Sequence, residues 1–541
     1  MVDYASRLFA ASRGCSDLQE VPGFFTKSVD LSVAAAKDER EVLKLSADWI
    51  EHQYGDLPLV QSAYQTNRQW ASIGSLDASK ADSEVWIRAR LATVRAKGKA
   101  AFMLFRTGVY TLQGTLFADE KTPKEMIKFV GKITPESIVD VFGKIVKSPA
   151  SVEGASQKDV ELQVRKIYVV SSSMKVLPLQ IADAMLPEPA SDDDEDEDST
   201  VVIDEKGERP RVKRKVRLDN RWMDMRTPCN HAIFRIQSRI SGLFKDFFHN
   251  RNFVEVHTPK IIAGASEGGA EVFRLKYFGR DACLAQSPQL YKQMCICSDL
   301  HGVYEIGPVF RAENSNTNRH LTEFVGLDFE MEIKEHYHEV LDTLWDLFCY
   351  IFDGLNSQCK DELQAVNSQY PFDPLKYTRD KLVIHFHDAI EMLRAAGIAA
   401  EHFEDLSTPQ EKALGKLVKQ KYGVDFYIVD QYPMAARPFY TMPNPDDPRY
   451  SNSYDVFLRG EEITSGAQRV HDPDLLVDRA INSSKPIPLD TIKSYIDSFR
   501  CGAPPHGGAG IGLERVTMLF LGLPNIRKSS LFPRDPKRVT P

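Results

Sequence analysis

One stretch of the sequence, residues 303–333, constrains the fold most strongly because it predicts two strands joined by a polar loop. The first strand, 303–311, is rich in β-branched and aromatic residues and ends on Arg311. The loop 312–319 has three asparagines and no large apolar side chain. In the second strand, from Phe324 to Ile333, apolar and polar residues alternate, which predicts one core face and one polar face.

The polar face of this hairpin carries chemistry that a packed core does not need. Arg311 can grip a phosphate or a carboxylate with two parallel hydrogen bonds, Phe324 can stack on a purine, and Asp328 can accept from an ammonium group. The alternation by itself favours a surface hairpin whose polar face is closed by salt bridges. Other parts of the chain are needed to decide between these two interpretations.

The composition is that of a soluble globular protein with three or four domains. Of the 541 residues, 43% are hydrophobic and 27% are charged. No apolar run reaches the roughly 20 residues of a membrane span. The first residues lack the long apolar core of a secretory signal, and the eight cysteines are scattered, which suits a reducing cytoplasm. We therefore expect a cytoplasmic protein with no membrane segment.

The net charge of −8 is concentrated in one segment. Residues 191–199 contain seven acids and no base, so the rest of the chain is close to neutral. Such a like-charged block is expected to be disordered. Near-neutrality elsewhere neither supports nor excludes a nucleic-acid partner, because a basic face can be balanced by acids on another face.

The predicted elements divide the chain into four parts. Residues 1–76 form an extension with a predicted helix at 33–49, 77–180 a β domain, 181–216 a linker with the acidic run, and 217–541 an α+β domain. In the β domain, strands are predicted at 85–94, 100–105, 108–117, 138–147 and 162–172, with a helix at 123–133. Five strands with a helix between the third and fourth are typical of an OB-fold barrel, whose sheet face binds oligonucleotides.

Two residues of the predicted barrel are candidates for contact with a nucleic acid. Phe102 and Gln113 fall on adjacent strands. An aromatic ring beside an amide suits stacking of an unpaired base and reading of its edge. A phenylalanine of the barrel core explains Phe102 equally well.

In residues 217–541 the predicted strands are grouped with few helices between them, which favours a mostly antiparallel sheet. Strands are predicted at 253–258, 303–311, 324–333, 424–429, 438–442, 454–459 and 462–469. Helices are predicted at 234–248, 286–297, 337–355, 409–422 and 489–500, and from Glu514 onward, while 357–378 has no clear pattern. The chain has no GxxxxGK[ST] phosphate-binding loop.

A glycine-rich segment at 506–515 reads HGGAGIGLER. Its four glycines allow another group to approach the backbone closely. Glu514 and Arg515 are expected to begin a helix, whose N-terminal amides favour an anion. Together with Arg311 opposite Phe324, Arg515 predicts a two-arginine clamp for a triphosphate beside a stacking platform.

The segment 461–469, EEITSGAQR, adds further candidate ligands. Glu462 and Ser465 can hold a hard cation through oxygen, as Mg²⁺ prefers. Arg469, beyond two small residues, can pair with the carboxylate of a substrate.

Three segments, in this order along the chain, resemble the three motifs of the class II aminoacyl-tRNA synthetases. FVEVHTPKI at 253–261 resembles motif 1, GPVFRAENSNTNRHLTEF at 307–324 motif 2, and HGGAGIGLER at 506–515 motif 3. This resemblance implies a catalytic domain built on an antiparallel sheet, with ATP as a substrate.

Other segments resemble one branch of that class. An OB-fold ahead of the catalytic domain is similar to subclass b, as is RLDNRWMDMR at 217–226. QSPQLYKQ at 286–293 and SGAQR at 465–469 resemble the aspartyl enzymes of the eukaryotic cytoplasm. The resemblance implies L-aspartate, ATP and aspartate tRNA as substrates, Mg²⁺ as cofactor, and a homodimer with Pro259 at its interface.

The resemblance also implies roles for individual residues. Arg311, Arg515 and Glu462 would be catalytic, and Glu462 and Ser465 would hold Mg²⁺. The positions implied for ATP are Arg311, Glu313, Arg319, His320, Leu321, Phe324, Glu462, Gly512 and Arg515. Those implied for aspartate are Glu267, Ser287, Gln289, Lys292, Arg311, Asp328, Ser465, Arg469 and His506. Those implied for tRNA are Phe102, Gln113, Ser315 and Thr317.

Two alternatives are less favoured. An asparaginyl-tRNA synthetase would leave two cations, Lys292 and Arg469, facing a neutral amide. A catalytically inactive paralogue that only binds RNA would not need every position implied for ATP, and all of these are intact.

Overall fold

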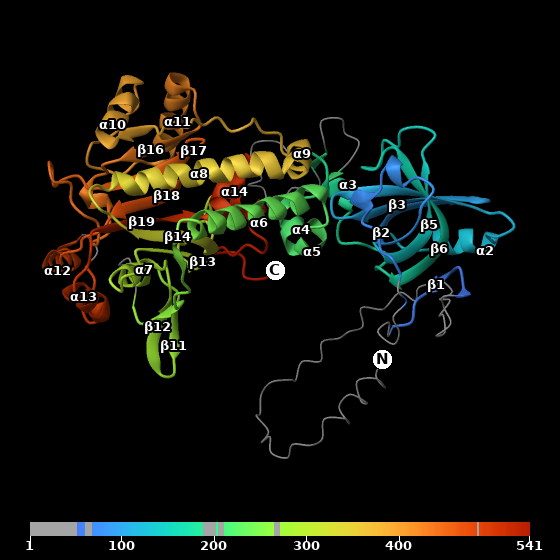
Figure 1. The fold of residues 1–541 in the computed structure, drawn as a ribbon, viewed down its shortest axis with the longest axis horizontal. Coiled ribbons are helices and arrows are strands. Elements are labelled where there is room, and N and C mark those ends of the chain that lie inside the picture. The colour runs from blue at the N-terminus through green and yellow to red at the C-terminus, as the bar shows by residue number, and fades with distance from the viewer. Residues whose placement is uncertain are drawn as a thin grey trace, which may run out of the picture.

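The computed structural model describes residues 51–59, 66, 68–187, 202–203, 210–264, 271–483 and 486–541, with only the backbone at 202–203 and 210–211. The predicted helix at 33–49, the acidic run and Glu267 lie outside these residues. A β barrel and a larger domain with a central sheet lie side by side along the long axis (Figure 1). Short helices lie between them: α3 (Ile181–Ala184), α4 (Arg214–Asp219) and α5 (Arg221–Asp224).

The barrel is the predicted OB-fold. Its strands are β2 (Glu84–Lys97), β3 (Ala100–Thr107), β4 (Tyr110–Phe117), β5 (Ile138–Lys147) and β6 (Val160–Ser171), with α2 (Lys124–Gly131) between β4 and β5. The order β6-β4-β3-β2-β5 closes into a barrel because β5 also pairs with β6. Residues ahead of β2 also belong to the barrel. Strand β1 (Tyr54–Asp56) pairs with β6, and the side chains of Ile73 and Leu76 lie in the barrel core. This domain therefore begins before the expected residue 77.

The larger domain has the mostly antiparallel sheet that the grouped strands predict, which confirms the α+β class. The strand order is β15-β16-β17-β18-β19-β14-β13-β9, and only the outermost pairs, β15–β16 and β9–β13, are parallel. The bounds are β9 (Val254–Glu255), β13 (Gly302–Phe310), β14 (Glu323–Glu332), β15 (Val383–His385), β16 (Phe426–Asp430), β17 (Ser453–Leu458), β18 (Glu461–Gln468) and β19 (His506–Gly512).

Two long helices, α6 (Pro228–His249) and α8 (His338–Gln358), run side by side and pack against the sheet (Figure 1). Their apolar faces meet the core face of β14, where Leu327 and Phe329 are fully buried as the alternation predicts. The other helices of this domain are α7 (Gln289–Ile296), α9 (Lys360–Gln369), α10 (Phe386–Ala395), α11 (Thr408–Tyr422), α12 (Pro473–Asn482), α13 (Lys493–Arg500) and α14 (Leu513–Phe520).

Smaller elements complete the described chain. A three-stranded sheet, order β10-β12-β11, projects from the catalytic sheet as a hairpin (Figure 1). The bounds are β7 (Val202–Ile203), β8 (Pro210–Arg211), β10 (Ile261–Ile262), β11 (Arg274–Tyr277), β12 (Arg280–Leu284), η2 (Ile73–Ser75), η3 (Ala78–Lys80), η4 (Met434–Ala436) and η5 (Ile526–Lys528).

Four sequence predictions differ from the structure. The predicted strand 438–442 is wrong: Pro438 and Pro443 have no N–H to donate, and only isolated bridges form, at Thr441 and Pro443. The predicted strand 253–258 shortens to β9, and the unpatterned 357–378 contains α9. The glycine-rich segment that precedes α14 is strand β19 in the middle of the sheet.

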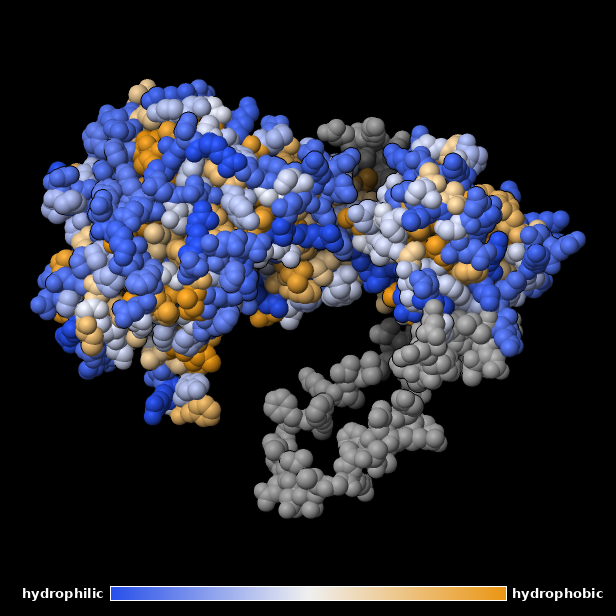
Figure 2. Space-filling view, in the orientation of Figure 1, coloured by the Kyte–Doolittle hydropathy of each residue, from blue (hydrophilic) through white to orange (hydrophobic). Residues whose placement is uncertain are grey.

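The barrel contacts the catalytic domain through a buried carboxylate. Glu136, in a turn of the barrel, accepts from Arg106 Nη2 at 2.7 Å and from Arg226 Nη1, just ahead of α6, at 3.1 Å. The face of the protein in Figure 2 is mainly hydrophilic, with apolar side chains in small patches. Among the described residues no helix is both long enough and apolar enough to span a membrane.

Candidate active site

The polar face of the central hairpin lines a cavity of about 440 Å³. Strands β14, β18 and β19 supply part of its wall, and the loop between β13 and β14, residues 437–441 and the start of α14 supply much of the rest. The sequence-predicted residues that line it are Ser287, Gln289, Arg311, Glu313, Arg319, His320, Leu321, Phe324, Asp328, Glu462, Ser465, Arg469, Gly512 and Arg515. The fold therefore brings together side chains that are more than two hundred residues apart in the sequence.

One end of the cavity has the arrangement expected for a nucleotide. The Arg311 guanidinium carbon lies 5.4 Å from the centre of the Phe324 ring, and Glu313 Oε1 lies 3.9 Å from Arg311 Nη1. Arg515 Nε is buried without a hydrogen-bond partner. A buried donor of this kind costs free energy unless a ligand accepts from it, so Arg515 indicates an anion at this end.

His320 and Arg319 line the same end but make contacts that the sequence does not predict. Burial, and then the positive charges of Arg515 and Arg319, lower the pKa of His320 to about 4, so its ring is neutral at pH 7. Thr317 Oγ1 lies 2.5 Å from His320 Nδ1. Arg319 donates to Glu411 Oε2 at 3.0 Å and to Thr408 Oγ1, which attaches the loop between β13 and β14 to α11.

The other end of the cavity has a layer of buried charges in its wall. Arg469 Nε donates to Glu330 Oε1 at 2.8 Å, and Lys292 Nζ donates to Asp328 Oδ1 at 3.1 Å and lies 3.4 Å from Glu330 Oε2. Burial alone would raise the pKa of Glu330, but Arg469 and Lys292 hold it below its ordinary value. Two cations and two carboxylates thus pair with each other in this buried layer, as buried charges require.

Not every predicted aspartate position lies at the cavity surface. Lys292 does not line the cavity, because its ammonium is taken by Asp328 and by the carbonyl oxygens of Phe329 and Ala509. His506 is fully buried, with Nδ1 2.7 Å from the carbonyl oxygen of Pro504, and it lies behind the charged layer. Arg469 and Asp328 do line the cavity and offer one positive and one negative charge there.

The glycines of β19 explain how these carboxylates fit against the sheet. Gly508 pairs with Glu330, and Gly510 pairs with Asp328. A Cβ on Gly508 would lie 2.1 Å from the carbonyl oxygen of Phe329 and 2.5 Å from Glu330 Oε2. The sequence predicts that another group approaches the backbone of these glycines closely, and in the structure the carboxylates of Glu330 and Asp328 do so.

An acidic residue that sequence analysis missed, Asp455 on β17, extends the predicted metal site. It pairs across the sheet with Ser465, and its Oδ1 is buried without a hydrogen-bond partner. Burial and then repulsion from Asp455 raise the pKa of Glu462. Two mutually repelling carboxylates and an orphaned oxygen fit a hard divalent cation. The segment SYDVFLRG carries no signal beyond an acid in a strand.

A second residue that sequence analysis missed, Arg437, holds Ser465 and Asp455 of this predicted metal site. Its guanidinium donates to Ser465 Oγ at 2.9 Å and to Asp455 Oδ2 at 2.8 Å. Several polar atoms around the cavity are buried without a hydrogen-bond partner: Gln286 Oε1, Gln289 Nε2, Arg437 Nε and Thr441 Oγ1. Unsatisfied donors and acceptors around one cavity indicate a polar ligand.

Comparison with known proteins identifies the family. Residues 213–536 match the model described as tRNA synthetases class II (D, K and N), and residues 85–170 match the OB-fold nucleic acid binding domain. The chain is 51% identical over 514 residues to the cytoplasmic aspartate–tRNA ligase of Pongo abelii, covering 95% of this chain and all of that protein. The Caenorhabditis elegans cytoplasmic aspartate–tRNA ligase is 51% identical over 508 residues, covering 94% and 93%. The chain belongs to the aspartate–tRNA ligase family.

Solved structures agree with this assignment. The aspartyl tRNA synthetase from Entamoeba histolytica is 47% identical with a TM-score of 0.81, covering 91% of this chain and 97% of that chain. The asparaginyl-tRNA synthetase from Pyrococcus horikoshii, complexed with asparaginyl-adenylate, is only 26% identical, with a TM-score of 0.74 and coverage of 88% and 100%. The asparaginyl alternative is therefore not favoured.

In the OB-fold domain that the family implies, the predicted RNA-contacting residues lie on the outer face of the barrel. Phe102 is 45% exposed and meets the ring of Phe117 edge-on, with centroids 5.9 Å apart. Gln113 donates to Glu161 Oε1 at 2.9 Å. Phe102 is therefore not a core residue, and Phe117 and Glu161 are neighbours that the sequence analysis missed.

The segment that resembles motif 1 lies at the edge of the catalytic sheet. Pro259 is exposed and follows β9, whose one strand partner among the described residues is β13. Val254 and Ile261, on either side of it, are 44% and 48% exposed. An unpaired edge with exposed aliphatic side chains favours contact with another chain.

Proposed function

We propose that this protein is an aspartate–tRNA ligase, which converts L-aspartate and ATP to aspartyl-adenylate and pyrophosphate and then transfers aspartate to the 3′ end of aspartate tRNA. The observation that carries the proposal is the charge arrangement of the cavity. Arg311 and Arg515 lie at one end beside the Phe324 ring, and Arg469 and Asp328 lie at the other. The first end suits a nucleotide triphosphate, and the second suits an amino acid with an ammonium group and a side-chain carboxylate.

In the proposed first step, an oxygen of the aspartate α-carboxylate attacks the α-phosphorus of ATP. The bond from that phosphorus to the bridging oxygen breaks, and pyrophosphate leaves with the electron pair. Arg311 would hold both the α-phosphate and the attacking carboxylate, so that they approach in line. Arg515 would stabilise the charge on the leaving pyrophosphate, and Glu313 and Phe324 would hold adenine by its edge and its ring.

In the proposed second step, a hydroxyl of the terminal ribose of tRNA attacks the carbonyl carbon of the aspartyl-adenylate, and AMP leaves. Ser315 and Thr317, in the loop between β13 and β14, would contact the tRNA end. His320 lines the same end of the cavity and would contact the outer phosphates. No protein nucleophile is needed in either step.

The class uses ATP with a divalent metal, and we propose that Glu462 and Ser465, with Asp455, hold Mg²⁺ here. The residues fit the ion, because Asp455 Oδ1 is buried without a partner and the two carboxylates repel each other. When bound, Mg²⁺ would neutralise phosphate charge. Arg437 would keep Asp455 and Ser465 in place.

We propose further that the protein acts in the cytoplasm as a homodimer that meets its partner copy along β9 and Pro259. The curated relatives named above are cytoplasmic ligases. The edge position of β9 and the exposure of Val254 and Ile261 support the interface.

The test of the proposed function is ATP–pyrophosphate exchange with a panel of amino acids, followed by charging of aspartate and asparagine tRNAs. Exchange is expected with L-aspartate alone. Exchange with asparagine would favour the asparaginyl alternative. Exchange with no amino acid, by a folded protein, would favour an inactive paralogue.

A further inference from the structure

We propose that the catalytic domain has a second cation site, on His387, Glu391 and His402, which takes a divalent transition-metal ion of the zinc class. Among the residues that the structure describes, these three form the one group of His, Cys, Asp or Glu side chains whose possible ligand atoms all lie within 4.8 Å of one another. None of the three lines the active-site cavity. The site therefore has no part in the chemistry proposed above.

The local fold brings the three side chains together. His387 and Glu391 are four residues apart on α10, so they project from one face of the helix. Gly397, at φ +79°, turns the chain after the helix and returns the following segment along that face. His402, on this returning segment, places its ring over that of His387, with centroids 4.6 Å apart and planes at 17°.

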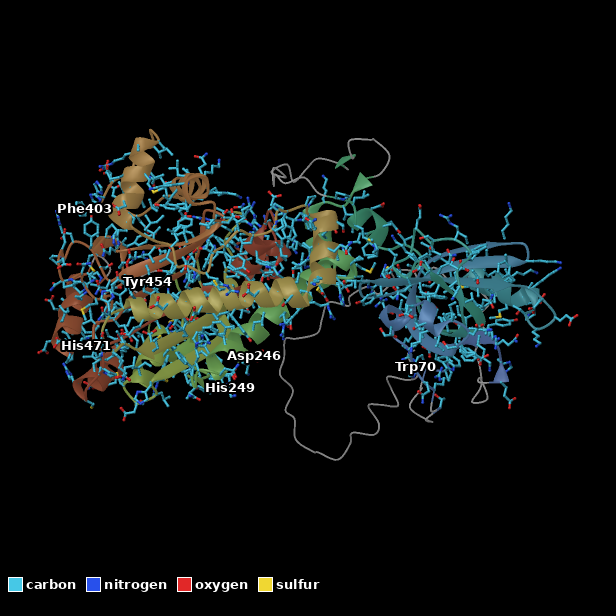
Figure 3. All side chains as sticks on the ribbon, turned by 45° about the horizontal axis from the view of Figure 1, so that its top comes forward. Trp70, Asp246, His249, Phe403, Tyr454 and His471 are labelled. Atoms are coloured by element: carbon cyan, nitrogen blue, oxygen red, sulfur yellow. The ribbon has the colours of Figure 1, made fainter. Side chains whose placement is uncertain are left out.

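The returning segment that carries His402 is fixed by two hydrogen bonds to its backbone. Arg394 Nε donates to the carbonyl oxygen of Ala400 at 2.9 Å. Gln410, which belongs to the capping box of α11, donates to the carbonyl oxygen of Ala399 at 2.8 Å. Phe403, next to His402, lies at the outer edge of the catalytic domain in Figure 3, so solvent reaches this part of the surface.

The donor atoms suit zinc and its neighbours. His402 Nε2 lies 3.1 Å from Glu391 Oε1 and accepts from Arg394 Nη1 at 2.9 Å. A ring nitrogen that accepts a hydrogen bond carries no proton, and the unprotonated nitrogen is the form that binds a metal. Two imidazoles and one carboxylate are a ligand set of Zn²⁺ that leaves a position for water, whereas Mg²⁺ and Ca²⁺ prefer oxygen alone.

The positively charged guanidinium of Arg394 lies among the three proposed metal ligands. Its Nη1 lies 2.9 Å from His402 Nε2 and 3.4 Å from Glu391 Oε1, between two of the three ligands. Its Nη2 also reaches Glu401 Oε2 at 3.3 Å, so the guanidinium has another carboxylate to which it can move. Arg394 Nη1 thus competes with a metal for two of the ligands, while Arg394 Nε holds the returning segment in place.

The test is titration of the full-length protein, without a histidine tag and after treatment with a chelator, with ZnCl₂ in an isothermal calorimeter. We expect the wild-type protein to bind one equivalent of Zn²⁺. His402→Ala and His387→Ala should each lower the affinity for Zn²⁺ by at least about tenfold, because the loss of a ligand costs no less than the loss of a group that supports a ligand. His385→Ala is the matched control, because His385 faces Asp430 at 2.6 Å instead.

Co²⁺ absorption separates this site from the free cysteines, because a histidine and carboxylate site gives d–d bands without thiolate charge transfer. The proposal is overturned if both histidine variants keep the wild-type affinity and stoichiometry for Zn²⁺. It is also overturned if the only Co²⁺ spectrum is that of a thiolate site.

Discussion

Glu330 and Arg469 form a buried ion pair in which Arg469 Nε lies 2.8 Å from Glu330 Oε1. Arg469 lines the cavity, and Glu330 lies behind it with no exposed surface. Arg469 Nη2 also donates to the carbonyl oxygen of Gly508 at 3.0 Å and to Gln289 Oε1 at 3.2 Å. The orientation of the guanidinium is therefore determined from behind the cavity, before a substrate binds.

We expect Glu330→Gln to lower kcat/KM for aspartate in pyrophosphate exchange by about two orders of magnitude. Removing one partner of a buried ion pair costs roughly 3–5 kcal/mol, and here it also frees Arg469 to leave its position. The effect should be on aspartate and not on the KM for ATP, because the ATP positions lie at the other end of the cavity.

Glu332→Gln is the matched control for that variant, because Glu332 lies on the same face of β14 but pairs with Lys334 and His301 near the surface. Its exchange kinetics should resemble wild type. Equal kcat/KM for aspartate in wild type and folded Glu330→Gln would refute the positioning role.

Asp455→Asn tests the metal assignment. We expect the Mg²⁺ concentration for half-maximal pyrophosphate exchange to rise by about tenfold or more, since a charged oxygen ligand becomes a neutral amide. Asp447→Asn is the control, because Asp447 pairs with Arg449 on the surface. An unchanged Mg²⁺ dependence in Asp455→Asn would place the ion elsewhere.

Phe102→Ala tests the barrel face. Loss of one stacked base costs roughly 1–3 kcal/mol, so kcat/KM for tRNA charging should fall by about 5- to 150-fold. Exchange without tRNA should be unaffected, because Phe102 is in the barrel and not in the catalytic domain. Phe403→Ala, a phenylalanine of nearly equal exposure (46% against 45%) on the catalytic domain, should leave both reactions unchanged. Wild-type charging by Phe102→Ala would exclude the proposed contact of Phe102 with tRNA.

Glu514 should make stability depend on pH. Burial raises the pKa of Glu514 to about 7, and the N–H of Val325 donates to its carboxylate at 3.1 Å. The folded state therefore binds a proton at Glu514 more tightly than the unfolded state does. The stabilisation that this proton gives to the folded state is fully present below the unfolded pKa near 4.5 and is lost as the pH rises through about 7.

Between pH 5 and pH 8 we expect the free energy of unfolding of the wild-type protein to fall by up to about 3 kcal/mol relative to that of Glu514→Gln. The glutamine of this variant can still accept from the N–H of Val325. Thermal or urea unfolding across that pH range measures the difference. Parallel stability curves for the two proteins would show that Glu514 ionises with its ordinary pKa.

Much of the architecture follows from local sequence patterns. The alternation of β14 predicts which face is core because side chains on a strand point to opposite faces in turn. The order of strands and helix in residues 84–171 predicts the barrel, since OB-folds share that order. The local hydrophobic pattern does not predict the structure where a segment has weak periodicity, as in α9. It also fails where prolines remove backbone donors, as around Thr441.

The sequence by itself determined the sheet class, the barrel and the two arginines at the nucleotide end, because each lies in a contiguous segment with its own pattern. Only the tertiary structure decided which charges meet at the aspartate end and which groups surround the predicted metal ligands. Glu330, Asp455 and Arg437 come from different strands and a loop, and nothing local marks them. Their roles arise from burial, because a charge removed from water must find its partner across the sheet, wherever that partner lies in the chain.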